Sequence, residues 1–333
     1  MKAILLSDAK RELLRVYTQE TLQKLQEKAD LDCTPYDKQA ILDNPAQFKD
    51  TEYIFSTWGM PQFTEEEIKT YLPGLKCVFY GAGSVQHFAR PFINCGVKVF
   101  SAWAANGVPV AEYTVAQIIL ANKGIFSNTK LASQGDREAA IANYLNYPGN
   151  YEVKIGIIGA GMIGKMVIER LKSYHMTVLV FDPFLSDEMA EKLGVEKVSL
   201  DTLFASCNVI SNHLANNEAT KGMLKGSHFE KMLPYATFIN TGRGAQIVED
   251  DLIAVLKKRP DVMALLDVTL PEPPVAGSDF YKLENCRLTS HIAGSIGNEV
   301  HHMSEYMLEE FIRYAGNQET RYEVSLKMLE TMA

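Results

Sequence analysis

The chain has 333 residues, 47% of them hydrophobic and 22% charged, so it is long enough for two globular domains with separate cores. Its net charge of −8 comes from 33 basic and 41 acidic residues without a basic stripe, which argues against nucleic acid as a partner. The most apolar long segment, Val97 to Ala121, is interrupted by Asn106, Pro109 and Glu112, so no membrane span is expected.

The five cysteines are odd in number and include no CxxC pair, which favours reduced, buried thiols in a cytoplasmic protein. The N-terminal stretch has only a short apolar run before Asp8, so a signal peptide is not expected.

The first hundred residues alternate strand and helix patterns. A helix is expected over Lys10 to Lys28, and Thr64 with Glu67 predicts a capping box for a helix that ends near Leu72. Strands are expected at Lys2 to Leu6, Glu52 to Ser56, Cys77 to Tyr80 and Val97 to Phe100. This alternation is typical of a parallel α/β layer.

A strongly apolar helix pattern runs from Val110 to Phe126, and the polar stretch 127–150 is expected to form irregular arms or short helices. Beyond Asp182 the alternation resumes. Strands are expected at Asn208 to Asn212, Thr237 to Thr241, Val262 to Val268 and Arg287 to Ser290. Helices are expected at Ser186 to Leu193, Leu200 to Ser206, Glu249 to Lys258 and Asn298 to Tyr314.

Between these halves, Val153 to Asp182 carries the fingerprint of a dinucleotide-binding unit. An apolar strand pattern leads into Gly159, Gly161 and Gly164, and then come a helix pattern and a second strand that ends on Asp182. The glycines allow a tight turn, close approach of a pyrophosphate and close packing of helix on strand. Asp182 is placed to accept both hydroxyls of an adenosine ribose, which predicts NAD as the cofactor.

The fingerprint lies in the middle of the chain, so an α/β domain precedes it. The last helix has no obvious strand partner and is expected to pack back onto that first domain. We therefore expect two Rossmann-like, doubly wound parallel-sheet domains, one of residues 1–105 plus 297–333 and one of residues 106–296, with cofactor and substrate meeting in a cleft between them.

Four predicted strands of the central domain end in polar groups, and parallel strands place such ends along one edge of a sheet. Arg243, Glu272 and His291 are thus expected to converge beside a nicotinamide. An arginine can hold a carboxylate in two hydrogen bonds, a histidine can exchange a hydroxyl proton near neutral pH, and a carboxylate beside the histidine orients it. Each residue alone has an ordinary reading, as a turn arginine, a surface acid or a core histidine. The catalytic interpretation depends on finding all three residues in this order, each after a predicted strand of the same domain.

With these motifs the chain resembles the D-isomer-specific 2-hydroxyacid dehydrogenases over nearly its whole length, most specifically in GAGMIG at 159–164, HLANNEAT at 213–220, NTGRG at 240–244, LDVTLPEPP at 266–274 and TSHIAG at 289–294. The resemblance implies that Arg243 binds substrate, His291 is the catalytic histidine and Glu272 is its acid partner. It implies cofactor contacts at Gly159, Gly161, Met162, Ile163, Gly164, Asp182, His213, Leu214, Ala215, Thr220, Thr241, Gly242, Arg243, Asp267 and His291. It implies substrate contacts at Ala82, Gly83, Ser84 and Arg243, and a homodimer formed through the NAD-binding domains.

Three positions depart from the family pattern. Val85 stands where an aspartate is usual, and Ala215 and Ser290 stand where prolines are usual. Trp58 and Trp103 lie on segments that either face the cleft or belong to the core. These departures leave the substrate open and favour an atypical pocket.

The expected activity is the NAD-dependent interconversion of a small-molecule 2-oxo acid and a D-2-hydroxy acid, without a metal site. A glyoxylate or hydroxypyruvate reductase is the alternative within the same chemistry. An NAD-sensing corepressor or binding protein on the same fold is the alternative outside enzymes.

Overall fold

The computed structural model describes residues 1–330 and divides into two compact units. Unit 1 combines Met1–Gly107 with the segment that begins at Ser295, and unit 2 is the continuous segment Val108–Gly294. Each unit has one largely parallel sheet with helices around it, which confirms the predicted α/β class. The cleft expected between the domains stays a prediction.

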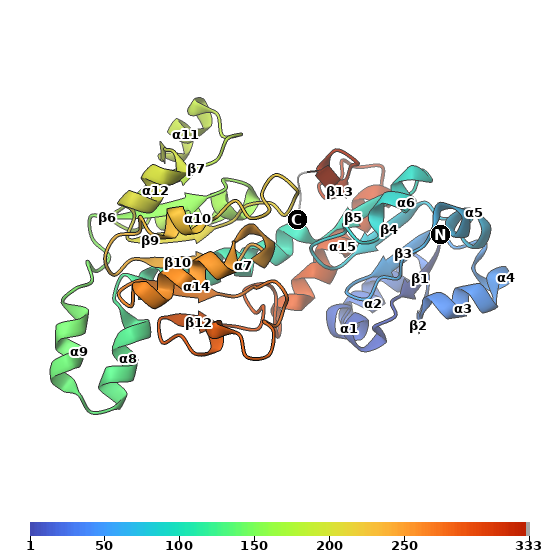
Figure 1. The fold of residues 1–333 in the computed structure, drawn as a ribbon. Helices are drawn as coiled ribbons and strands as arrows, with labels where there is room; N and C mark the ends of the chain where they lie inside the picture. The colour runs from blue at the N-terminus through green and yellow to red at the C-terminus, as the bar shows by residue number, and fades with distance from the viewer. Residues whose placement is uncertain (331–333) are drawn as a thin grey trace. The chain divides into compact units, whose positions relative to one another are not determined.

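Unit 1 is organised around a six-stranded sheet in the order β13-β5-β4-β3-β1-β2 (Figure 1). All neighbours pair in parallel except β13, which is antiparallel to β5. The strands are β1 (Lys2–Leu6), β2 (Asp30–Tyr36), β3 (Tyr53–Ser56), β4 (Cys77–Tyr80), β5 (Lys98–Ser101) and β13 (Glu323–Val324). The helices are α1 (Lys10–Val16), α2 (Gln19–Gln26), α3 (Lys38–Asp43), α4 (Pro45–Phe48), α5 (Glu65–Tyr71), α6 (Ala89–Asn94), α15 (Glu299–Ala315) and the 3₁₀ turn η3 (Met328–Glu330).

At the start of the chain one expectation is wrong and one strand was not predicted. The single helix over Lys10 to Lys28 is broken, because the Thr18 side chain accepts a hydrogen bond from the Thr21 amide and caps a new helix, α2. The segment Asp30–Tyr36 is strand β2, which was not predicted because polar residues and Pro35 dilute its strand pattern; it lies at the edge of the sheet, where proline is tolerated. The capping box of Thr64 and Glu67 is confirmed.

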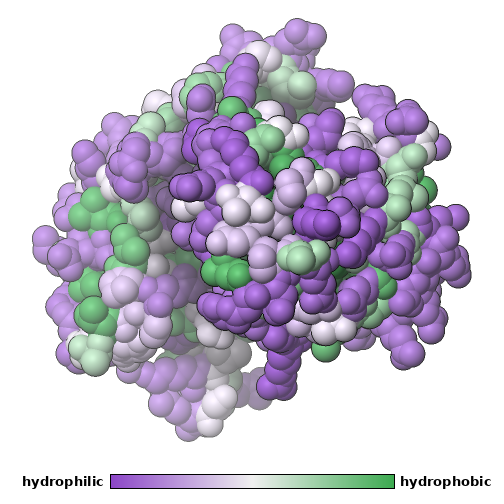
Figure 2. Space-filling view, turned by 90° about the vertical axis from the view of Figure 1, so that its right-hand side faces the viewer, coloured by the Kyte–Doolittle hydropathy of each residue, from purple (hydrophilic) through white to green (hydrophobic). Residues whose placement is uncertain are grey.

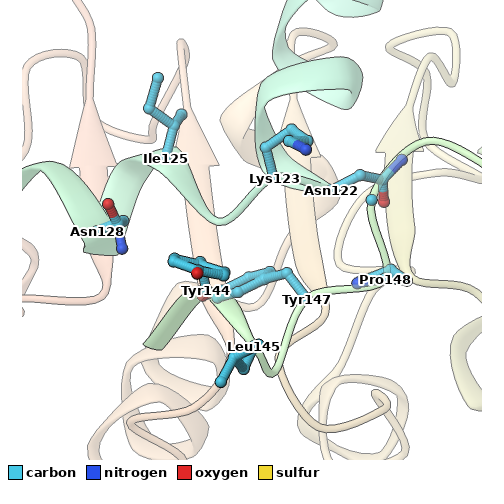
Figure 3. Close-up of a pocket in the computed structure, with 9 residues that line it drawn as sticks. Asn122, Lys123, Ile125, Asn128, Tyr144, Leu145, Tyr147 and Pro148 are labelled. Carbon is cyan, nitrogen blue, oxygen red and sulfur yellow. The ribbon is translucent and has the colours of Figure 1, made fainter. Parts of the chain in front are cut away.

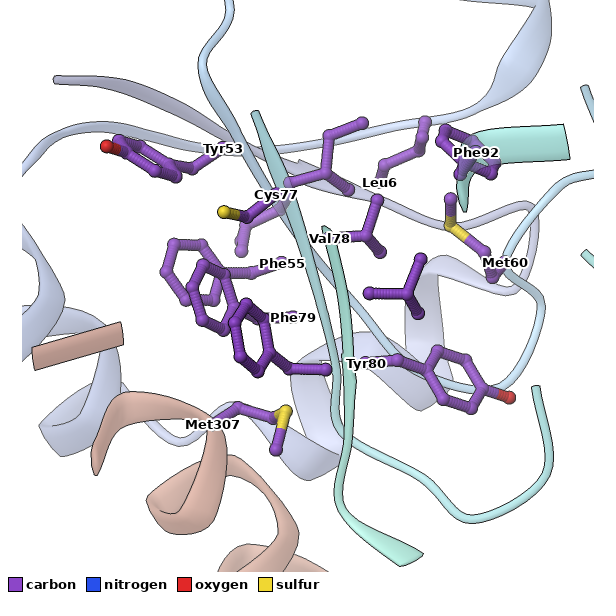
Figure 4. Packing of buried hydrophobic residues seen from close by; sticks show 14 of the residues in the cluster. Leu6, Tyr53, Phe55, Met60, Cys77, Val78, Phe79, Tyr80, Phe92 and Met307 are labelled. Carbon is purple, nitrogen blue, oxygen red and sulfur yellow. The ribbon is translucent and has the colours of Figure 1, made fainter. Parts of the chain in front are cut away.

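The core of unit 1 is aromatic. Phe55, Phe79 and Phe100 stack across β3, β4 and β5 with ring centroids 5.2 and 4.9 Å apart, and Phe311 of α15 meets Phe55 and Phe79 edge-on at 5.4 and 5.6 Å. Figure 4 shows Phe55 and Phe79 side by side, with Met307 of α15 close to Phe79. Helix α15 thus packs on the sheet of unit 1.

Unit 2 is organised around a seven-stranded sheet in the order β12-β11-β10-β9-β6-β7-β8, with every neighbouring pair parallel. The strands are β6 (Val153–Ile158), β7 (Met176–Phe181), β8 (Glu196–Lys197), β9 (Val209–Asn212), β10 (Thr237–Asn240), β11 (Met263–Leu266) and β12 (Cys286–Leu288). Its helices after the first strand are α10 (Met162–Leu171), α11 (Asp187–Leu193), α12 (Leu200–Ser206), α13 (Gly226–Phe229) and α14 (Glu249–Lys258), with the 3₁₀ turns η1 (Gly244–Gln246) and η2 (Asp279–Tyr281).

Three helices precede the first strand of unit 2. Helix α7 (Trp103–Ala121) begins seven residues before the expected Val110 and contains Pro109, whereas α8 (Ile125–Ser133) and α9 (Arg137–Tyr144) form the short helices expected before the fingerprint. Pro109 falls in the second turn of α7, where its nitrogen cannot donate a helical hydrogen bond to the carbonyl of Ala105.

Among residues 1–330, no helix combines the length and apolar character needed to cross a membrane. The face of the molecule in Figure 2 is mostly polar, with apolar residues in small groups.

A buried carboxylate fastens the last described segment to unit 1. Glu310 of α15 is fully buried, and its oxygens accept hydrogen bonds from the amides of Arg321 (2.9 and 3.1 Å) and Tyr322 (3.0 Å). This clamp precedes β13, which extends the sheet beyond β5.

We expect Glu310→Ala to lower the free energy of unfolding by about 2–4 kcal/mol, because it leaves buried amides without partners. Chemical denaturation checks this change. Glu309→Ala is the matched control on the same helix, since Glu309 makes exposed ion pairs with Arg313 and Arg321 and should contribute less than about 1 kcal/mol. Equal losses in the two variants would contradict the assigned role of Glu310.

Candidate active site

The glycine turn between β6 and α10 has the geometry of a phosphate cradle. Gly159 has φ of +90°, and a Cβ there would lie 2.8 Å from the carbonyl oxygen of His213. A Cβ at Gly164 would lie 2.0 Å from the carbonyl oxygen of Gly159, so only glycine lets the helix approach the turn. A Cβ at Gly161 would meet no atom within 4 Å, and no side chain caps the helix there. The free N–H groups at the start of α10 therefore face open space, which fits an anionic ligand.

Asp182 follows β7 and braces the same turn. Its Oδ2 accepts a hydrogen bond from the Ala160 amide at 2.7 Å, and its Oδ1 accepts one from the Phe184 amide at 2.7 Å. A carboxylate oxygen can accept two hydrogen bonds, so each oxygen keeps capacity for a ribose hydroxyl.

The parallel order of β9, β10, β11 and β12 places their carboxyl ends along one edge of the sheet. There the structure brings together two of the predicted catalytic residues. His291, after β12, shares a hydrogen bond of 2.9 Å between its Nδ1 and Oε1 of Glu272, after β11. Both side chains are about half exposed, with 47% and 40% of their surface accessible. With Nδ1 occupied, Nε2 is the ring atom left for proton exchange.

The turn that carries His291 is held by Asp267. His291 has φ of +58°, a left-handed conformation that is uncommon outside glycine, and its amide donates to the Asp267 carbonyl. The buried Asp267 carboxylate accepts hydrogen bonds from the Ile292 amide (2.8 Å), the Ala293 amide (2.9 Å) and the Thr289 hydroxyl (2.5 Å). Asp267, predicted only as a cofactor contact, therefore also shapes the backbone around His291.

Arg243 is half-buried in the turn after β10. Its Nη1 donates to the Gly242 carbonyl at 2.7 Å, which leaves the other guanidinium N–H groups for a ligand. Burial lowers the pKa of Arg243, and the nearby charge of Glu272 raises it. Glu272 therefore acts on both the arginine and the histidine.

The loop that carries Glu272 is anchored to the Arg243 turn. A Cβ at Gly244 would lie 2.1 Å from the carbonyl carbon of Thr269, so the two backbones pass in direct contact. Glu249 accepts a hydrogen bond from the Leu270 amide at 2.8 Å, and burial raises the pKa of its carboxyl. These contacts fix the position of the start of the loop that carries Glu272.

Three further predicted cofactor contacts differ in what their side chains do. His213 pairs its Nε2 with the Ser211 hydroxyl at 3.0 Å, and burial lowers its pKa to about 4, so the ring stays neutral near pH 7. The Thr220 hydroxyl contacts the carbonyl oxygens of Ala215 and Asn217 within its own loop. The Thr241 hydroxyl is buried and has no partner within residues 1–330, so it is free to bond a ligand.

The predicted substrate loop lies in unit 1 after β4. The Ser101 hydroxyl contacts the carbonyl oxygens of Ala82 and Gly83 at 2.9 and 2.6 Å. In the described chain, the amides of Gly83, Ser84 and Val85 make no hydrogen bond. Because Ser101 holds the loop and three successive amides have no partner, the loop can donate hydrogen bonds to a carboxylate ligand.

A separate hollow lies where α7, α8 and α9 meet (Figure 3). It is lined by Asn122, Lys123, Ile125, Asn128, Tyr144, Leu145, Tyr147, Pro148 and Gly149. This lining contains no carboxylate and no histidine, so the hollow lacks the acid–base pair that the sheet edge provides.

Sequence reasoning missed one group of residues at this edge. Asn212, Asn240 and Gln246 are fully buried amides that hydrogen-bond one another beneath the Arg243 turn. The available signal was an asparagine at the end of two apolar strand patterns, which is costly to bury without partners.

Comparison with known proteins gives a consistent result. The family described as "D-isomer specific 2-hydroxyacid dehydrogenase, NAD binding domain" matches residues 115–293. A D-3-phosphoglycerate dehydrogenase of Archaeoglobus fulgidus is 32% identical over 235 residues, which cover 71% of this chain and 44% of that protein. A glyoxylate reductase of Korarchaeum cryptofilum is 26% identical over 301 residues, which cover 88% of this chain and 89% of that protein.

Among solved structures, the D-mandelate dehydrogenase of Rhodotorula graminis superposes with a TM-score of 0.80 at 22% identity, covering 97% of both chains, which shows a shared fold. The chain spans only 44%, 61% and 41% of the length of the first three curated relatives it matches.

We expect Gly161→Ala to fold with a Tm within about 2 °C of wild type, because its φ of −66° suits alanine and the added methyl meets nothing. The methyl would occupy the place of the pyrophosphate, so the Kd for NADH should rise about tenfold or more. Fluorescence titration measures this affinity. Gly164→Ala is the contrasting variant and should lose both stability and binding. Unchanged NADH affinity in Gly161→Ala would place the cofactor elsewhere.

Proposed function

The chain belongs to the D-isomer-specific 2-hydroxyacid dehydrogenase family, and we propose that it interconverts a 2-oxo acid and a D-2-hydroxy acid by hydride transfer with NAD(H). The observation that carries this proposal is the hydrogen bond of 2.9 Å between His291 and Glu272. This pair lies at the sheet edge that also carries Arg243 and the glycine turn. It is an acid–base pair at the edge where an open α/β sheet binds its ligands.

In the direction of reduction, Arg243 holds the substrate carboxylate through its free N–H groups and polarises the neighbouring carbonyl. The bound cofactor supplies the hydride. His291, protonated, donates the proton on Nε2 to the carbonyl oxygen. Glu272 keeps Nδ1 protonated and stabilises the charged ring before the proton leaves. In oxidation, the neutral Nε2 accepts the hydroxyl proton instead.

The free amides of Gly83 and Ser84 support the proposal that the 81–84 loop also binds the carboxylate. The identity of the substrate is a narrower question. The alignment with a glyoxylate reductase runs along most of both chains, which favours a small 2-oxo acid such as glyoxylate or hydroxypyruvate as the second candidate.

The decisive experiment is oxidation of NADH by the purified chain with a panel of pyruvate, glyoxylate, hydroxypyruvate and phenylglyoxylate. We expect turnover of at least one acid, and a kcat/KM with NADH about tenfold or more above that with NADPH, because Asp182 repels a 2′-phosphate. Tight NADH binding without turnover of any acid would favour an NAD-sensing protein. Equal use of NADPH would contradict the role given to Asp182.

We expect Glu272→Gln to lower kcat for reduction about tenfold or more, because a neutral amide replaces the charge-assisted hydrogen bond that orients the His291 ring. A less firmly held ring presents Nε2 to the substrate carbonyl in the reactive orientation for less of the time. The rate of NADH oxidation at saturating 2-oxo acid measures the change. Glu284→Gln is the control, because Glu284 is an exposed acid of unit 2 paired with Lys130. Equal kcat values for Glu272→Gln and wild type would refute the pairing mechanism.

We also propose that two copies associate through their NAD-binding units. Helix α9 and the residue after it expose Ile141, Tyr144 and Leu145, with 37%, 48% and 71% of their surface accessible. Tyr144 and Leu145 also line the hollow of Figure 3. A cytoplasmic location is proposed as well, because all five cysteines are unpaired.

Light scattering should therefore give twice the monomer mass of 37.2 kDa. Leu145→Asp should shift the protein toward monomer, because it puts a charge into the apolar contact. Leu326→Asp, at an exposed leucine of unit 1, should not. A wild-type monomer would end the dimer proposal.

A further inference from the structure

Three amide side chains lie completely buried beneath the Arg243 turn. Asn212 ends β9, Asn240 ends β10, and Gln246 closes the 3₁₀ turn that follows Arg243. The Asn212 Nδ2 donates to Oδ1 of Asn240 at 2.9 Å and to Oε1 of Gln246 at 2.6 Å. Amides without water nearby are stable only when such bonds are made, so their arrangement is strongly determined.

The trio of amides holds the main chain of Arg243 from both sides. The Arg243 amide donates to Oε1 of Gln246 at 3.0 Å, and the Arg243 carbonyl accepts from Nδ2 of Asn240 at 3.2 Å. The preceding residue is held as well, because the Gly242 amide donates to Oδ1 of Asn240 at 3.1 Å. The guanidinium thus projects from a turn whose backbone is fixed by buried side chains.

The same trio reaches the segment after β9. Nε2 of Gln246 donates to the carbonyls of Leu214 and Ala215 at 2.7 and 3.0 Å. His213 precedes this segment, and its carbonyl oxygen would lie 2.8 Å from a Cβ at Gly159, so it is close to the glycine turn. Gln246 therefore bonds the main chain of both Arg243 and the 214–215 segment. Asn212 also accepts a hydrogen bond from the Leu214 amide at 3.3 Å, but it reaches Arg243 only through Asn240 and Gln246.

We propose that Gln246 is a positioning residue that sets the placement of the Arg243 guanidinium, and so the strength with which Arg243 selects a carboxylate. This inference rests on the proposed function. Gln246 touches neither substrate nor cofactor in this role. It acts through the Arg243 backbone, so its loss should affect carboxylate recognition more than the rest of the reaction.

The test compares a 2-oxo acid with its uncharged 2-oxo amide, at saturating NADH. Gln246→Leu should lower the ratio of kcat/KM for acid over amide about tenfold or more, because only the acid uses the guanidinium. General loosening or weaker NADH binding would lower both rates together and leave the ratio unchanged. Oxamate affinity, measured by calorimetry with NADH present, should fall by a similar factor and needs no turnover.

Asn285→Leu is the matched control in the same unit. Asn285 is a buried amide that donates to the carbonyls of Leu256, Arg259 and Val262, so its loss should destabilise unit 2 without changing the ratio. Arg243→Gln defines complete loss of selectivity. Should Gln246→Leu fail to fold, Gln246→Met keeps the unbranched shape and takes its place.

A wild-type acid-to-amide ratio or oxamate affinity in a folded Gln246 variant would overturn the positioning role while the proposed function stands. A wild-type chain that neither turns over a 2-oxo acid nor binds oxamate would overturn the proposed function and this inference together.

Discussion

The parallel pairing of β6 with β9 through β12 is the constraint on which the rest of the site depends. Because these strands run in one direction, each delivers the residue after its carboxyl end to the same edge of the sheet. The glycine turn, Arg243, Glu272 and His291 are far apart in the chain and come to one edge for this reason alone. A reversed strand would carry its loop to the opposite edge, however well its side chains were chosen.

The loops at this edge are braced by polar side chains from their neighbours. Asp267 holds the turn of His291, Glu249 holds the start of the Glu272 loop, and Gln246 holds Arg243. Such groups are costly to bury, and their cost is offset only when every hydrogen bond is made. These loops therefore keep their geometry although they have no regular secondary structure. An acid–base pair needs such fixed loops if it is to meet a substrate in one orientation.

Local patterns predicted much of this architecture. The β6 strand, the turn at Gly159, Gly161 and Gly164, and the position of Asp182 follow from short-range rules of backbone geometry and polarity. The edge strand β2 was not predicted, because its alternation of apolar and polar residues is weak. The hydrogen bonds of Asn212 with Asn240 and Gln246 join residues 28 and 34 positions apart, so they depend on the register of neighbouring strands. The left-handed backbone of His291 depends likewise on Asp267, which follows β11, whereas His291 follows β12.

The discontinuity of unit 1 has a consequence for how the protein is made. Unit 2 is a single continuous segment, so its core can close once residue 294 has left the ribosome. The N-terminal strands are synthesised first, yet the aromatic face of Phe55, Phe79 and Phe100 gains Phe311 only when α15 emerges. The part of the chain that is synthesised first therefore completes its folding last. Until then, the rings of Phe55, Phe79 and Phe100 remain exposed to chaperones and to other nascent chains.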